Sequence, residues 1–159
     1  MSIFPTKILL ATDSSEEAGL AANTAADIAR VFGSELHVVH VEEYPAELIA
    51  AYGPFTYIDV EAVQTMIEEA ESEARKVLDE QVRHVEEAGG SVTRSYLRQG
   101  WPPQEIVKLA EEIGAGLIVM GSRGLGGMKR TLMGSVSDSI VRHAHCPVLV
   151  VRKWQGTCR

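Results

Sequence analysis

Residues 117–137 read LIVMGSRGLGGMKRTLMGSVS. The apolar run from Leu117 to Met120 predicts a buried strand that ends at Gly121. A glycine-rich loop with basic side chains follows, and apolar residues at helical spacing begin after Gly134. A strand, a glycine loop and a helix start in this order are typical of an anion site. The unpaired N–H groups of a helix start and the helix dipole both favour negative charge. We therefore expect a phosphate group here.

The glycine spacing narrows the kind of phosphate site. The G-x-x-x-x-G-K-[ST] motif has no match, and a G-x-G-x-x-G motif that starts at Gly124 breaks at Lys129. The spacing that does occur is Gly121-x2-Gly124-x9-Gly134-Ser135. In these residues the chain resembles the ATP-binding branch of the universal stress protein family. The alternative interpretation is a glycine-rich turn before a helix, with incidental basic residues.

The resemblance extends over nearly the whole chain. It includes KILLATDSS at 7–15, LHVVHV at 36–41, IVKLAEEIGAGLIVMGSRG at 106–124 and CPVLVV at 146–151. The family members often have proline where this chain has Ala11. If the backbone makes the contact there, alanine changes little.

The resemblance implies a site for ATP or another adenine nucleotide, with Mg²⁺ held through the phosphates. Its base and ribose would lie against Ala11, Thr12, Asp13, Val41, Met120 and Gly121. Its phosphates would lie against Gly124, Gly134, Ser135, Val136 and Ser137, and we place the basic Arg123 of the same loop in the site as well. For Asp13, the alternative is a purely structural role in the turn that leads into the first helix.

The remaining patterns predict an α/β fold. Short apolar strands alternate with helical segments, which is typical of a parallel sheet covered on both faces. We expect a single-domain, Rossmann-like three-layer sandwich with five strands and four helices, spanning 1–153, and a loose tail at 154–159. We expect Ser14 and Glu17 to form a capping box at the first helix, and Asp59 to cap a long helix. The resemblance implies the strand order 3-2-1-4-5. The first and fourth strands would then end side by side, where ligands of such sheets bind.

Composition and charge limit the function classes. The net charge of −7 argues against nucleic-acid and membrane-surface binding. Residues 42–87 hold thirteen acidic side chains against three basic ones, whereas 121–137 hold none that is acidic. The absence of acidic side chains from 121–137 suits the binding of a phosphorylated ligand. The apolar runs are too short for a membrane span, no signal peptide is recognisable, and two cysteines make no disulfide framework. We therefore expect a cytoplasmic protein.

Three functions remain open. The preferred hypothesis is a nucleotide-binding module that acts in stress response or signalling. The second is a slow ATPase that uses the same site, although no residue stands out as a catalytic base for water. The third is an interaction protein with an empty pocket, which the intact glycine pattern disfavours. No spacing of His and Cys residues indicates a protein-held metal.

The last apolar run predicts how the chain assembles. In the order 3-2-1-4-5, Val148–Val151 is an uncharged edge strand, which invites pairing with another chain. We expect a homodimer in which this strand meets its own copy across a two-fold axis, as is common in the resembling family. The alternative is that the tail at 154–159 folds back over this edge.

Overall fold

The computed structural model describes residues 5–44, 57, 59–122 and 133–153. Within them the chain alternates strands and helices around one parallel sheet of order β3-β2-β1-β4-β5. The predicted fold class and strand order are confirmed. The elements are β1 (Lys7–Thr12), α1 (Glu16–Phe32), β2 (Glu35–Glu42), α3 (Val60–Glu87), β3 (Val92–Gln99), α4 (Pro102–Ile113), β4 (Leu117–Gly121), α5 (Ser135–His143) and β5 (Val148–Val151).

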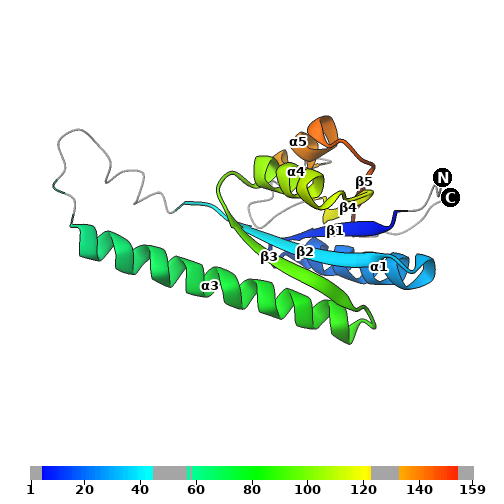
Figure 1. The fold of residues 1–159 in the computed structure, drawn as a ribbon, viewed down its shortest axis with the longest axis horizontal. Helices are drawn as coiled ribbons and strands as arrows, with labels where there is room; N and C mark the ends of the chain where they lie inside the picture. Colours follow the sequence, from blue (N-terminus) through cyan, green and yellow to red (C-terminus); the bar gives the residue numbers. More distant parts are fainter. Residues whose placement is uncertain (1–4, 45–56, 58, 123–132, 154–159) are drawn as a thin grey trace.

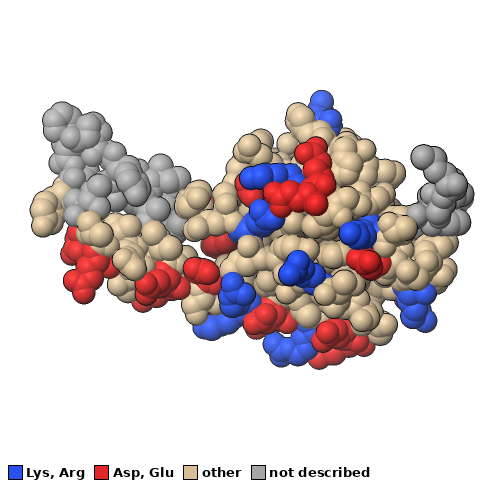
Figure 2. Space-filling model, viewed as in Figure 1, with Lys and Arg blue, Asp and Glu red and all other residues tan. Residues whose placement is uncertain are grey.

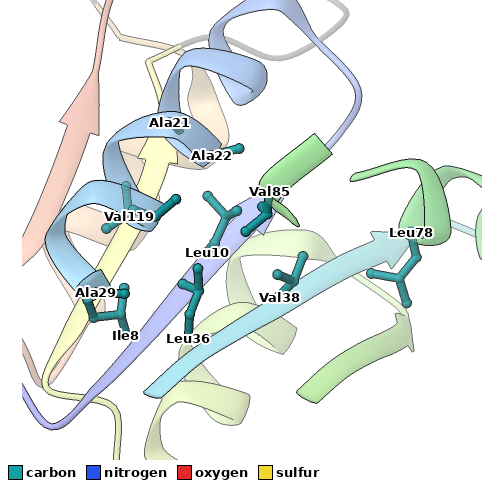
Figure 3. Close-up of a cluster of buried hydrophobic side chains, with 12 residues drawn as sticks. Ile8, Leu10, Ala21, Ala22, Ala29, Leu36, Val38, Leu78, Val85 and Val119 are labelled. Carbon is teal, nitrogen blue, oxygen red and sulfur yellow. The ribbon is translucent and has the colours of Figure 1, made fainter. Parts of the chain in front are cut away.

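Helices cover both faces of the sheet. Figure 1 shows α1 and α3 on one side and α4 and α5 on the other. On the α1 side, side chains such as Ile8 and Leu10 of β1 are completely buried against the alanines of α1 (Figure 3). Alanine has so small a side chain that the helix can lie close to the sheet. Leu9, Ile118 and Ile140 are equally buried in the core on the α4 and α5 side.

The order in which strands are added to the sheet reverses at the central strand, β1. The chain leaves β1 through α1 to pair with β2, and β4 later pairs with the opposite side of β1. Ala11 lies beside Met120 in this pairing and beside Val39 in the other. The carboxyl ends of β1 and β4 therefore lie together at the point where the strand order reverses, as predicted.

The start of α1 differs from the prediction. Its N-cap is Ser15 rather than Ser14, and the Ser15 side chain accepts a hydrogen bond from the amide of Ala18. Ser14 has a φ of 66°, a left-handed conformation that cannot begin a helix. The prediction that Ser14 and Glu17 form a capping box is therefore wrong. The predicted cap at the long helix is confirmed, because the Asp59 side chain accepts hydrogen bonds from two amides of the first turn of α3.

Helix α3 is the longest element, with 28 residues. Its acidic side chains are conspicuous along the lower edge of the molecule in Figure 2. None of the helices in the described part of the chain combines the length and apolar composition of a membrane span. The tail predicted at 154–159 lies outside the described residues.

Candidate nucleotide site at the carboxyl edge of the sheet

The candidate site begins where β1 and β4 end. Ala11 and Met120, neighbours in the sheet, are 6% and 5% exposed and belong to the core on the α4 and α5 side. Beyond them Asp13 is half-buried, and its carboxylate accepts a hydrogen bond of 3.0 Å from the amide of Ser15. Asp13 thus has the turn-forming contact of the structural alternative.

Ser122 joins the two helix starts at this edge. Its hydroxyl donates to the Glu17 carboxylate of α1 at 2.7 Å. Its carbonyl oxygen accepts from the amide of Gly134 at 2.7 Å and from the hydroxyl of Ser137 at 3.0 Å. Its amide donates to the carbonyl of Val151 in β5. One buried residue therefore sets how α1, α5 and β5 lie relative to one another.

Gly121 is required by the close approach of α1. A Cβ added there would lie 2.9 Å from the carbonyl carbon of Glu17 and 3.0 Å from the amide nitrogen of Ala18. Both are backbone atoms, which cannot turn away as a flexible side chain can. The first glycine of the motif is thus explained by helix packing.

The start of α5 is built differently. Gly134 is the N-cap, with φ −74° and ψ 163°, and among the described residues no side-chain hydrogen bond caps the first turn of this helix. Ser135 is exposed and Val136 is half-buried, whereas the buried Ser137 directs its hydroxyl to carbonyl oxygens of Ser122 and Gly134. The backbone amides of the first turn are what this helix start offers to an anion.

Thr12 is held from two sides. Its carbonyl oxygen accepts a hydrogen bond of 3.0 Å from Nδ1 of His40 in β2. Its hydroxyl donates to the side-chain oxygen of Gln81 in α3 at 2.8 Å. These contacts fix the last residue of β1 and connect the long helix to the candidate site.

A pocket of about 220 Å³ lies nearby, at the carboxyl ends of β2 and β3. Glu42, Leu97, Arg98 and Gln99 line it from the sheet, and Glu71, Ala74 and Arg75 line it from α3. Val41, the predicted base contact on β2, is half-buried and precedes Glu42. The pocket wall is therefore rich in charged groups of both signs.

The structure brings most predicted site residues to one edge of the sheet. Ala11, Thr12, Asp13, Val41, Met120 and Gly121 lie at the ends of three neighbouring strands, and Gly134, Ser135, Val136 and Ser137 form the start of α5. Arg123 and Gly124 lie outside the described residues.

Three residues at this edge had no predicted role in the site, namely Ser122, His40 and Gln81. Ser122 could have been noted as the first residue after β4. His40 is a polar side chain inside an apolar strand, which is a signal for a specific partner. Gln81 gave no signal, because its contact depends on how a long helix is rotated over the sheet.

The other reactive groups do not indicate a second site. Burial raises the pKa of the Cys146 thiol, which keeps it protonated at neutral pH. The described residues include no cluster of three or more His, Cys, Asp or Glu side chains that could hold a metal.

Comparison with known proteins shows which proteins this chain is similar to. The model of the universal stress protein family matches residues 5–152. Universal stress protein MJ0531 of Methanocaldococcus jannaschii is 35% identical over 147 residues, which cover 92% of this chain and 82% of that protein. MJ0577, a universal stress protein of the same organism, is 31% identical over 164 residues, which cover 96% and 98%.

Solved structures agree with the sequence comparison. The structure of MJ0577 superposes with a TM-score of 0.78 at 28% identity and covers 98% of this chain and 100% of that one. The universal stress protein from Archaeoglobus fulgidus in complex with dAMP has a TM-score of 0.63 at 25% identity and covers 94% and 99%. The strand order and these matches agree, and the chain belongs to the universal stress protein family.

Proposed function

We propose that this protein binds ATP, or another adenine nucleotide, at the carboxyl ends of β1 and β4 and acts as a nucleotide-dependent module in stress response or signalling. The observation that carries the proposal is the uncapped start of α5 beside the point where the strand order reverses. The dAMP complex of the Archaeoglobus fulgidus relative supports an adenine nucleotide as the ligand.

The residues present fit such a ligand. Ala11 and Met120 offer an apolar floor for a base, and Asp13 offers a carboxylate oxygen for the hydroxyl groups of a ribose. Gly134 has no side chain to occupy the space in front of the α5 amides. In this proposal Mg²⁺ is held through the phosphates, where it would neutralise part of their charge.

We favour binding over hydrolysis because the acids at the two helix starts are engaged. Glu17 accepts from Ser122, and Asp138 accepts from Arg142 at 2.9 Å. Each carboxylate therefore already has a donor within the chain, which argues against its use as the base for an attacking water. Slow hydrolysis of ATP at the same site is the alternative function. The experiment must therefore distinguish hydrolysis from binding alone.

The experiment is to denature the purified protein and identify the nucleotides released by mass spectrometry. We expect an adenine nucleotide in proportion to protein. Incubation of the stripped protein with MgATP should then release ADP no faster than a buffer control. Recovery of no nucleotide, together with no thermal shift on adding MgATP, would contradict the proposal.

We also propose that the protein forms a homodimer through β5 and resides in the cytoplasm. All four residues of β5 are only half-buried, and β5 is an edge strand of the sheet. Light scattering at micromolar concentration should give the mass of a dimer, and Val150→Lys should lower it towards the monomer mass. A monomer mass for the parent protein would contradict the assembly.

A further inference from the structure

Strand β3 forms one free edge of the sheet. It pairs with β2 alone and is eight residues long, whereas β5 at the other edge has four. Figure 1 shows β3 as the outermost strand on its side of the sheet. Thr93, Arg94 and Ser95 are exposed. A free edge presents unpaired backbone groups to any strand that can pair with them.

The register determines which backbone groups of β3 face outward. Gly100, directly after the strand, donates its amide to the carbonyl oxygen of Glu42 in β2 at 3.0 Å. Backbone groups of successive residues point to opposite sides of a strand, and the register is unbroken over the last six residues of β3. Even-numbered residues therefore face β2, and the N–H and C=O groups of Ser95, Leu97 and Gln99 face outward. Among the described residues, no hydrogen bond reaches these outward groups.

The side chains on one face of β3 are basic and aromatic. Arg94, Tyr96 and Arg98 alternate along the strand and share the face that α4 covers. Arg98 is paired with Glu112 of α4. The guanidinium of Arg94 instead lies 5.9 Å from the centroid of the Tyr96 ring, and no carboxylate of the described residues is paired with it. Residues 91–101 hold two arginines and no acidic residue, in a chain of net charge −7.

We propose that the edge of β3 from Arg94 to Gln99 binds an extended, acidic segment of a partner protein, which adds a strand to the sheet. The outward backbone groups supply main-chain hydrogen bonds. Carboxylates at alternate positions of the segment pair across the strands with Arg94 and Arg98, and an apolar side chain between them meets Tyr96. This interaction is independent of the proposed nucleotide binding.

The charge of the edge disfavours a second copy of this chain as the occupant. An antiparallel pair of β3 strands centred on Tyr96 places Arg94 of each copy opposite Arg98 of the other, and like charges directly opposite each other destabilise a sheet. The register shift between Leu36 and His37 leaves Thr93 of β3 without a partner in β2. Such bulges and edge charges discourage indiscriminate pairing. An acidic segment makes the same charges attractive, so they select the partner.

The experiment titrates nitrogen-labelled, nucleotide-free protein with two synthetic peptides that are as long as β3, eight residues. In one peptide glutamate, valine and glutamate alternate with threonine, and in the other lysine replaces both glutamates. We expect the glutamate peptide to shift the amide signals of Ser95, Leu97 and Gln99 and to slow their hydrogen exchange. The lysine peptide should bind at least about tenfold more weakly. Arg94→Glu should reverse this preference.

Two variants of Ser95 test the hydrogen bonds. Ser95→Pro removes an amide that faces outward, and proline is accepted at such positions of an edge strand. The protein should therefore fold and lose at least about tenfold in affinity for the glutamate peptide. Ser95→Thr is the matched control, because it keeps the amide and should bind like the parent protein.

No response of the β3 amides at about 1 mM glutamate peptide, or equal affinity for the two peptides, would overturn the proposal. A smaller mass for Ser95→Pro than for the parent protein in light scattering would also overturn it, because a second copy would then occupy the edge. Since the titration uses nucleotide-free protein, failure to bind MgATP would contradict the proposed function and leave this inference standing.

Discussion

The starts of α1 and α5 both lie at the carboxyl ends of the strands. They differ in whether the N-cap side chain accepts a hydrogen bond from a first-turn amide. At α1, Ser15 caps the amide of Ala18, and Glu16 and Glu17 supply negative charge. At α5, the N-cap is a glycine with no side chain, and the first-turn acid Asp138 is paired with Arg142. Two helix starts of the same fold are therefore capped differently.

The difference indicates which helix start suits a ligand. A helix start that its own chain has capped gains stability and has little left to attract an anion. A start capped only by glycine forgoes that stability and keeps its amides for an external anion. Ser122 contacts both starts, so α1 forms a rigid support while α5 carries the proposed phosphate contacts.

The largest expected effect comes from giving α5 the kind of cap that α1 has. Gly134→Asp should be tolerated by the backbone, because φ −74° suits any residue, and its carboxylate should cap the helix and repel phosphate. We expect the affinity for MgATP to fall by about 100-fold, or about 2.7 kcal/mol, with no loss of thermal stability. Calorimetry and thermal unfolding measure the two quantities.

Gly134→Asn is the matched control, since it has a similar shape without the charge. It should lose less affinity than Gly134→Asp does. Equal binding by Gly134→Asp and the parent protein would mean that the phosphates do not approach the α5 start.

The second-largest expected effect is a loss of stability. Gly121→Val forces side-chain atoms against the backbone of α1 at Glu17 and Ala18, and should lower the free energy of unfolding by about 2–3 kcal/mol. Denaturant titration measures this change. In the control Gly19→Ala, the added Cβ lies an ordinary 3.7 Å from Nε2 of His84, and alanine favours the helix by up to about 1 kcal/mol. If the two variants have the same stability, α1 does not constrain Gly121.

The third effect removes the cap from α1. Ser15→Ala loses the hydrogen bond to the Ala18 amide and should lower the free energy of unfolding by about 1 kcal/mol. Because α1 supports the site without offering its amides to the nucleotide, the affinity for MgATP should stay within about twofold of the parent value. A tenfold loss of affinity with unchanged stability would show that the two helix starts have been assigned the wrong roles.

The smallest effect concerns the residue before that cap. Ser14 is exposed with φ 66°, a conformation that glycine adopts without strain. Ser14→Gly should raise the free energy of unfolding by about 0.5 kcal/mol, the relief of strain being partly offset by the greater freedom of glycine in the unfolded chain. Thermal unfolding of Ser14→Gly beside Ser14→Ala measures the difference. If Ser14→Gly is the less stable of the two, the strain at this position is not the deciding factor.

Much of this account was predictable from local patterns. Apolar runs predicted four of the five strands and a weak alternation at 91–97 predicted the third, while Asp59 was identified as a cap from its position before a helical pattern. The resemblance to the family supplied the strand order, which local patterns do not determine. The residues of the predicted site then converged because parallel strands end at a common edge.

The errors and omissions have physical causes. Two serines follow Asp13, and only the backbone conformation of Ser14 decides that Ser15 is the cap. The contact of His40 with Thr12 joins residues 28 apart in the chain, so it depends on the register of β1 with β2. Gln81 reaches Thr12 across 69 residues, from a helix whose rotation no local pattern determines.

The central claim is that an adenine nucleotide binds at the start of α5. Its most direct test is calorimetric titration of MgATP into nucleotide-free parent protein and into Gly134→Asp under identical conditions. The account predicts saturable binding with one nucleotide per chain for the parent and about 100-fold weaker binding for the variant. No heat of binding for the parent, or equal affinities for the two proteins, would contradict it.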